Sequence, residues 1–193
     1  MNPAFHARFD ELAASVHGQI GQCMPEFKAF LEYAALYFEA RSIGRPVVVE
    51  IGVWRNSQKR FYEQLLGAEH IGIDIDPTTG ADILGDSPSA KTVDKLKERL
   101  GGRPIDLLFI DGNHSYKGAK LDYEAYENLT RHLVVLHDLL CETHRDIKVG
   151  ELWRELKAQN RDYVYVLFHK PRAHEHGTCW DGQEMGIGVM VKA

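Results

Sequence analysis

Hydrophobic positions along the 193-residue chain change their spacing near Pro46. Before that point, apolar residues recur every three or four positions, which predicts an amphipathic helix at the N-terminus carrying Phe5, Phe9, Leu12 and Val16. A second helix is expected from about Pro25 to Ala40, because proline is favoured in a first helical turn. This part of the chain is therefore expected to be helical.

After Pro46, short apolar runs alternate with helical patterns. The runs that predict strands span residues 47–49, 71–74, 81–84, 105–110, 133–136, 163–168 and 185–191. Helices are expected after Ser57, after Ser89 or Thr92, from about Tyr116 to Leu129, and around residues 149–156. This alternation is typical of an α/β fold whose parallel sheet has helices on both faces.

The end of the chain departs from this alternation. No helical pattern separates residues 163–168 from residues 185–191, so the last strand is free to pair antiparallel. Neither a linker nor a repeat interrupts the pattern. We therefore expect a single domain over residues 1–193, with N-terminal helices in 1–45 and an α/β core in 46–193.

Composition and charge exclude some classes of protein. Hydrophobic residues make up 44% and charged residues 26%, which is ordinary for a globular domain. The net charge of -5 offers no basic surface, so a nucleic-acid partner is not expected. No apolar run approaches the roughly 20 residues that span a bilayer, so no membrane partner is expected. Cys23, Cys141 and Cys179 are odd in number and far apart, which favours reduced thiols and a cytoplasmic location.

The second helix is unusually rich in aromatic residues. Its apolar positions cover more than one face, and they include Phe27, Phe30, Leu31, Ala34, Tyr37 and Phe38. Such an excess is explained by packing in the protein core or by a homodimer formed through the N-terminal helices.

Acidic residues gather at the ends of the predicted strands. In an open α/β sheet, ligands bind outside the carboxyl ends of the strands. These ends carry Glu50 and Gly52, Asp74, Asp86 with Ser87, Asp111 with His114, and Asp138. The pattern predicts a shared functional edge. An acid in the place of Asp74, about 20 residues past the first turn, is expected to accept hydrogen bonds from ribose hydroxyls.

Six segments carry a resemblance to a known family. They are VVVEIGVWRNSQ, IGIDIDP, LGDS, DLLFIDGNHSYKGAKLDYEAY, VVLHD and the terminal GIGVMV. Together they resemble the class I S-adenosylmethionine-dependent methyltransferases, and most of all the small O-methyltransferase-like branch with an FIDG-x-HSY signature. The resemblance covers about residues 46–192. It implies a Rossmann-like, doubly wound sheet of seven strands whose last strand is antiparallel, and methyl transfer to a small-molecule acceptor at oxygen.

The resemblance also assigns roles to the strand-end residues. Glu50 and Gly52 belong to the turn that approaches the methionine part of S-adenosyl-L-methionine, and Asp74 takes the ribose hydroxyls. Asp86 and Ser87 are expected beside the adenine. Asp111 is expected where the transferred methyl group meets the acceptor, so it counts as both a cofactor-binding and a catalytic residue.

His114 and Asp138 complete the predicted catalytic group. His114 follows Asp111 by three residues, and its reference pKa near 6.5 suits a base that takes a proton from the acceptor. The alternative is a loop histidine that bonds to the next helix. His137 is expected to be structural, because it alternates to the opposite face from Asp138.

A metal ion is implied only by the resemblance. In metal-assisted members of the family, acids matching Asp111 and Asp138 hold a divalent cation, for which Mg²⁺ is suited by its preference for oxygen ligands. These members commonly carry a further acid or amide after the second position, where this chain has Leu139. The two carboxylates are therefore expected to orient the acceptor either directly or through a metal.

The first turn departs from the family pattern as well. Arg55 and Asn56 stand where two glycines are usual. Asn56 tolerates a left-handed backbone, and Arg55 is expected to point outwards or to pair with a carboxylate. This departure leaves two alternatives to an active methyltransferase. One is a non-catalytic binding protein with a degenerate cofactor turn, and the other is a nucleotide enzyme that grips phosphate with Arg55 and the helix start at Ser57.

The late loop offers a further set of candidate ligands. His174, His176 and Cys179 have the donor types of a zinc site, but no fourth ligand has suitable spacing. We therefore expect this segment to form a loop over the active edge of the sheet.

Overall fold

The computed structural model describes residues 2–16, 18–141, 145–160, 162–169 and 185–192. Its strands are β1 (Val47–Ile51), β2 (Glu69–Asp74), β3 (Ile83–Leu84), β4 (Ile105–Ile110), β5 (Thr130–Leu136), β6 (Val164–Phe168) and β7 (Ile187–Val191). Its helices are α1 (Pro3–Ser15), α2 (Met24–Ala40), α3 (Lys59–Leu65), α4 (Ala90–Leu100), α5 (Tyr116–Tyr126), the short 3₁₀ helix η1 (Glu127–Leu129) and α6 (Val149–Gln159). Across these ranges, no helix has the length and apolar character needed to cross a membrane.

The strands form one sheet in the order β3-β2-β1-β4-β5-β7-β6. β1 to β5 run parallel, whereas β7 pairs antiparallel with both β5 and β6. The predicted Rossmann-like sheet of seven strands, with its last strand inserted antiparallel, is confirmed. The strand order reverses between β1 and β4, and ligands bind at such a switch point in doubly wound folds.

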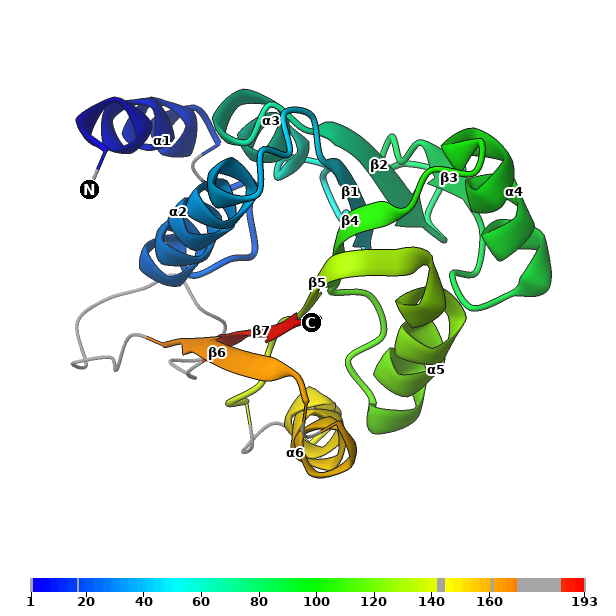
Figure 1. Cartoon of the computed structure of the whole chain (residues 1–193). Coiled ribbons are helices and arrows are strands. Elements are labelled where there is room, and N and C mark those ends of the chain that lie inside the picture. The colour runs from blue at the N-terminus through cyan, green and yellow to red at the C-terminus, as the bar shows by residue number, and fades with distance from the viewer. Residues whose placement is uncertain (1, 17, 142–144, 161, 170–184, 193) are drawn as a thin grey trace.

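Helices cover the sheet on two sides (Figure 1). One apolar cluster joins α1, α2 and α3 to residues such as Val48, Phe109 and Val135. The other joins α4, α5 and α6 to residues such as Val49 and Leu108. Successive residues of a strand point to opposite faces, so each central strand must be apolar on both. This requirement explains why the run 105–110, which is apolar except for Asp106, matches β4 in both of its bounds.

The N-terminal helices pack against the chain's own sheet. Phe27 and Phe30 of α2 are fully buried, with Phe27 5.4 Å from the ring of Phe61 in α3 and Phe30 5.7 Å from the ring of Phe109 in β4. The aromatic residues of α2 therefore belong to the core of the chain. A homodimer through these helices stays a prediction.

Of two helix starts, one matches the expectation and the other differs from it. The hydroxyl of Ser89 caps α4 by accepting a hydrogen bond from the Thr92 N–H, so the first of the two alternatives is confirmed. Ser57 does not cap α3. Its hydroxyl instead donates to the Arg55 carbonyl at 3.5 Å, within a turn that continues past Ser57 before the helix begins.

Candidate active site

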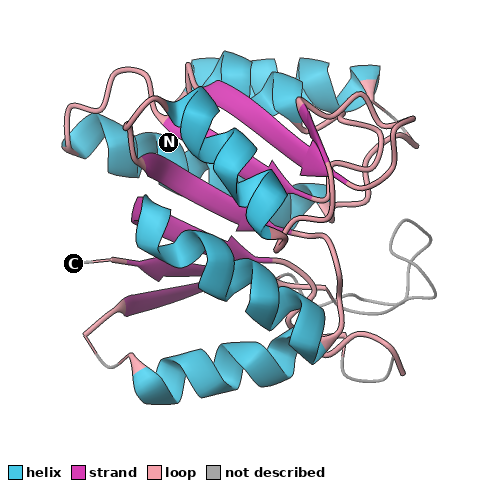
Figure 2. Ribbon diagram, turned by 90° about the vertical axis from the view of Figure 1, so that its right-hand side faces the viewer, coloured by secondary structure: helices cyan, strands magenta, loops and turns pink. Residues whose placement is uncertain are grey.

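The carboxyl ends of the parallel strands meet the connecting loops along one edge of the sheet (Figure 2). A cleft of about 890 Å³ lies along this edge. Most of the predicted site residues line it: Gly52, Asp74, Asp86, Ser87, Asp111, His114 and Asp138. The opposite wall includes residues 19–22, which connect α1 to α2. The N-terminal extension thus completes the cleft.

Gly52 follows β1 and packs against the backbone of the residues that follow β4. Its φ of 80° lies in the left-handed region, and a Cβ atom added there would lie 2.6 Å from the Cα of Gly112. No other residue fits both constraints. The glycine is therefore required by the backbone itself, and it also leaves the cleft open beside Asp111.

The rest of this turn keeps a left-handed shape without further glycine. Trp54 has a φ of 46° and Asn56 a φ of 54°, so the expectation that Asn56 keeps the turn is confirmed. The Asn56 amide donates to the Gly80 carbonyl at 2.8 Å. Arg55 is exposed, lies over the ring of Trp54 at 4.7 Å and donates to the Gly18 carbonyl. Arg55 therefore points outwards, as one of the two expectations had it, and does not pair with a carboxylate among the described residues.

Asp74 ties this turn to β2. Its Oδ2 accepts hydrogen bonds from the N–H groups of Val53 and Trp54, at 2.9 and 3.2 Å, and its Oδ1 accepts from the Asp76 N–H at 2.9 Å. A carboxylate offers about four lone pairs, so capacity for a ligand hydroxyl remains. Asp74 therefore shapes the turn in addition to lining the cleft.

Asp86 and Ser87 follow β3 and form the far end of the cleft. Asp86 is exposed, whereas the Ser87 hydroxyl donates to Asp122 at 2.5 Å. Burial raises the pKa of Asp122 to about 6, although the bond from Ser87 opposes the shift. Tyr126 donates to the Ser87 carbonyl. Asp122 and Tyr126 of α5 thus hold the loop after β3 through Ser87. The sequence of α5 gave no indication of this role.

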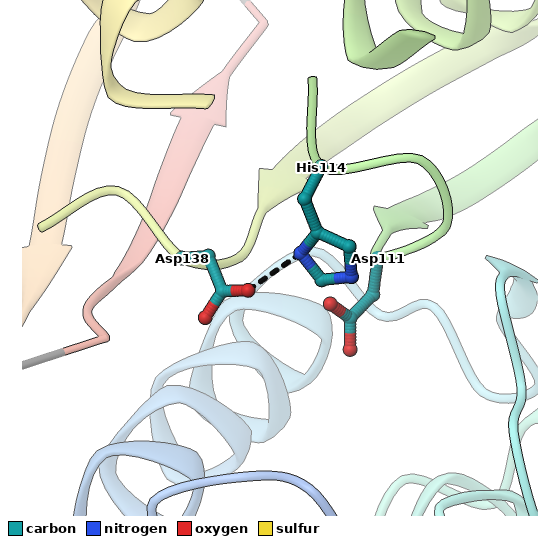
Figure 3. Close-up of side chains that lie close together, drawn as sticks. All are labelled: Asp111, His114 and Asp138. Atoms are coloured by element: carbon teal, nitrogen blue, oxygen red, sulfur yellow. Dashed lines mark ion pairs between the residues drawn. The ribbon is translucent and has the colours of Figure 1, made fainter. Parts of the chain in front are cut away.

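His114 and Asp138 come from the loops after neighbouring strands and meet across the cleft. His114 Nδ1 lies 2.6 Å from Asp138 Oδ2, and the imidazole lies between the two carboxylates of Asp138 and Asp111 (Figure 3). The bond to Asp138 raises the pKa of His114 above its usual value, against an opposing effect of burial. The hydroxyl that caps α5 belongs to Ser115, so His114 is not the capping residue of the alternative reading.

Asp111 is held from two sides. Its Oδ2 accepts from the Gln22 amide at 2.7 Å, and its Oδ1 lies 2.9 Å from His137 Nδ1. His137 is almost fully buried and its Nδ1 also lies 3.3 Å from Asp138 Oδ1. Burial lowers the pKa of His137, but the two carboxylates outweigh it and raise the pKa to about 9. Sequence analysis missed Gln22, which reaches Asp111 from the N-terminal segment. The expectation that His137 turns to the face opposite Asp138 is wrong, because β5 ends at Leu136 and the left-handed backbone of Asp138, with a φ of 60°, breaks the alternation.

Glu50 does not reach the cleft. Val47, Val49 and Ile51 face α4 to α6, so alternation turns Glu50 to the other face of the sheet. There its carboxylate lies 2.7 Å from His70 Nε2 of β2, and both side chains are fully buried. Burial raises the pKa of Glu50. The structure thus separates Glu50 from the other predicted cofactor-binding residues.

The donor atoms near Asp111 have the spacing of a cation site, but a nitrogen of His137 already lies between its two carboxylates. Asp111, His114 and Asp138 each offer one atom within 4.8 Å of the others. Hydrogen bonds from Gln22 and His137 occupy Asp111, however, and His114 and the Cys141 thiol donate to Asp138. Leu139 is buried and supplies no ligand. As arranged, these residues do not fit a divalent cation such as Mg²⁺.

A protein-family model described as a methyltransferase domain matches residues 40–139, more than half of the chain. The chain belongs to this family. No curated protein sequence is similar enough to this methyltransferase-family chain to count as a match. The match spans β1 to the end of β5 and so includes every predicted cofactor-binding and catalytic residue.

Solved structures similar to this methyltransferase-family chain share its fold. The O-methyltransferase TomG from Streptomyces achromogenes, crystallised with S-adenosylmethionine, has a TM-score of 0.62 at 15% identity, covering 100% of this chain and 91% of TomG. A Bacillus cereus O-methyltransferase in complex with S-adenosylhomocysteine has a TM-score of 0.56 at 13% identity, covering 100% and 92%. MycE, from the mycinamycin biosynthetic pathway and crystallised with magnesium and S-adenosylhomocysteine, has a TM-score of 0.59 at 16% identity. The chain spans about half of MycE, with coverages of 94% and 53%.

One set of predicted ligands cannot be placed. His174, His176 and Cys179, the candidate zinc ligands, lie outside the described residues.

Proposed function

We propose that this chain transfers the methyl group of S-adenosyl-L-methionine to an oxygen atom of a small-molecule acceptor. The observation that carries the proposal is the 2.6 Å pair of His114 and Asp138 in the cleft of a methyltransferase-family domain. Asp138 holds His114 by Nδ1, and among the described residues none bonds to its Nε2. A histidine oriented in this way by a carboxylate is suited to take a proton from a bound hydroxyl.

The cofactor is proposed to lie along the cleft from β1 to β3. Its methionine part would pass the turn at Gly52, its ribose hydroxyls would bond to Asp74, and its adenine would lie beside Asp86 and Ser87. Support comes from the position of these residues along one cleft. TomG, a structure of the same fold, was solved with S-adenosylmethionine.

Transfer would proceed by direct displacement. The acceptor oxygen attacks the methyl carbon in line with the departing sulfur, and the sulfonium becomes the neutral thioether of S-adenosylhomocysteine. The acceptor proton passes to His114 Nε2 and later to water. Asp138 stabilises the imidazolium that forms, and the negative charge of Asp111 favours the sulfonium in the bound cofactor.

The alternative of a non-catalytic binding protein rested on Arg55, Asn56 and Leu139. Asn56 holds the left-handed turn, Arg55 points away from the cleft, and Leu139 packs in the core. None of these residues blocks the cleft. The phosphate-binding alternative loses its support as well, because Ser57 is buried and Arg55 is bound to the Gly18 carbonyl.

A turnover assay tests the proposal. The protein is incubated with S-adenosylmethionine and a panel of phenols, sugars and hydroxy acids, and S-adenosylhomocysteine is measured. We expect product with at least one acceptor, and a loss of about 100-fold or more in kcat for His114→Ala, the usual contribution of a general base. Cofactor binding without turnover on any acceptor class would favour the non-catalytic alternative. The proposal includes a cytoplasmic location, which suits the buried thiols of Cys23 and Cys141.

A further inference from the structure

His137 occupies the space between the two carboxylates that a metal ion would bridge. Its Nδ1 lies 2.9 Å from Asp111 Oδ1 and 3.3 Å from Asp138 Oδ1. An ionised carboxylate oxygen can only accept a hydrogen bond. Nδ1 therefore carries a hydrogen atom, and the ring bridges the two acids as a donor.

The surroundings hold this arrangement in place. The imidazole of His137 stacks on the ring of Phe109 at 6.3 Å, and only 3% of the residue is exposed. Gln22 donates to the remaining oxygen of Asp111, and His114 pairs with the remaining oxygen of Asp138. Each oxygen of Asp111 and Asp138 thus has a donor from the protein, and these donors come from the N-terminal segment and from the loops after β4 and β5.

We propose that the Nδ1–H of His137 takes the place of a divalent cation between Asp111 and Asp138, and that methyl transfer by this chain needs no metal ion. The statement that methyl transfer needs no metal ion rests on the proposed function. The statement that His137 takes the place of a cation concerns metal binding alone. His137 acts through the two carboxylates and is therefore a positioning residue.

The proposal follows from what a cation would have to do at this place. It would neutralise two neighbouring acids, fix their oxygens and face the acceptor. His137 already bridges the acids, and His114 already faces the cleft. A cation bound to the same oxygens would have to displace His137 from a buried position, which costs far more than displacing water.

Replacement of His137 by an acidic residue should allow a divalent cation to bind between Asp111 and Asp138. His137→Glu puts a third carboxylate beside Asp111 and Asp138, and a cluster of carboxylate oxygens suits Mg²⁺ or Mn²⁺. His137→Gln is the matched control, because its amide keeps an N–H donor and adds no carboxylate.

The test is a titration of metal-free protein with MgCl₂ and with MnCl₂, read by calorimetry and by the electron paramagnetic resonance signal of free Mn²⁺. Wild type and His137→Gln are expected to show no binding up to about 10 mM, beyond the range of weak cation sites. His137→Glu is expected to bind at least roughly tenfold more tightly than wild type, a difference of about 1.4 kcal/mol. Thermal unfolding and S-adenosylhomocysteine binding check that each variant is folded.

The outcomes are distinct from those of the proposed function, because metal binding is read without turnover. Wild-type binding of Mg²⁺ below about 1 mM that Asp111→Asn abolishes would overturn the inference. So would a folded His137→Glu that gains no affinity, since His137 would then not be what excludes the metal. Once an acceptor is known, the kcat of the wild type should be unchanged by chelators. A loss of kcat with chelators would overturn only the statement that methyl transfer needs no metal ion.

Discussion

His114 and Asp138 are joined by a 2.6 Å contact between Nδ1 and Oδ2, although they belong to different loops of the sheet edge. The contact exists because β4 and β5 are neighbouring parallel strands, so the loops that follow them leave the sheet side by side. It fixes the tautomer of the imidazole and directs Nε2 away from Asp138.

The first prediction concerns this pair. The pKa of His114 is raised chiefly by its bond to Asp138. A base must be deprotonated to act, so kcat should rise with pH through the pKa of His114. Asp138→Asn removes the charged partner, and the rising limb of the pH–rate profile should move to lower pH while the maximal kcat falls. A variant of a histidine remote from the cleft, His132→Asn, should leave the profile unchanged. An acid limb that stays in place in Asp138→Asn would show that His114 is not the titrating base.

The second prediction concerns the ribose. Asp74→Ala removes an ionised acceptor, and hydrogen bonds to charged groups contribute about 1.5–3 kcal/mol each. Affinity for S-adenosylhomocysteine should fall at least roughly tenfold by calorimetry. Because Asp74 also holds three backbone N–H groups, the melting temperature should fall as well. Asp76→Ala is the neighbouring control, since the Asp76 carboxylate accepts from Thr78 alone among the described residues and the residue is exposed. Equal affinity in both variants would leave Asp74 as a turn residue alone.

The third prediction separates backbone strain from close packing. Gly52 and Gly101 both have positive φ, but a Cβ at Gly101 meets nothing within 4 Å. Gly101→Ala should cost about 1–2 kcal/mol from the left-handed backbone alone. Gly52→Ala adds a collision with β4, so its cost should be about 3 kcal/mol or more. Urea unfolding measures both. Similar losses in the two variants would contradict the requirement for close approach at Gly52.

The fourth prediction is a pH dependence of stability. The pKa of His137 is about 9 in the folded chain and near 6.5 when unfolded. A raised pKa means that the stabilisation is fully present below about pH 6.5 and is lost as pH rises through about 9. The wild type should therefore lose up to roughly 3 kcal/mol of unfolding free energy between these values relative to His137→Gln. Parallel pH profiles for the two proteins would contradict a charged His137.

Much of the fold could be predicted because it depends on local patterns. The apolar run of β4 and the helix-free end of the chain were sufficient to give a parallel sheet with an antiparallel last strand. Glu50 shows the limit of reading residues at strand ends. Its position suggested the cleft, but the period of two along β1 turns its side chain toward His70.

The acidic residues of the candidate site could be predicted from the sequence. The residues that donate hydrogen bonds to them could not. Asp111, His114 and Asp138 stand within about four residues of the ends of β4 and β5, which places them at the edge without further information. Gln22 contacts Asp111 across the fold, and its sequence neighbourhood contains no signal for this contact. His137 directly follows β5, but its contact with both acids depends on the left-handed backbone of Asp138, which alternation along a strand does not predict. Long-range hydrogen bonds of this kind follow from the packing of segments and not from their composition.

Calorimetric titration of the wild-type chain with S-adenosylmethionine, and with S-adenosylhomocysteine, tests the central claim most directly. The account predicts binding of one cofactor per chain with a dissociation constant between about 1 μM and 1 mM, the usual range of KM values for enzymes. It also predicts that chelators leave this binding unchanged. The absence of any heat at about 1 mM of either compound, with the chain folded, would contradict the account.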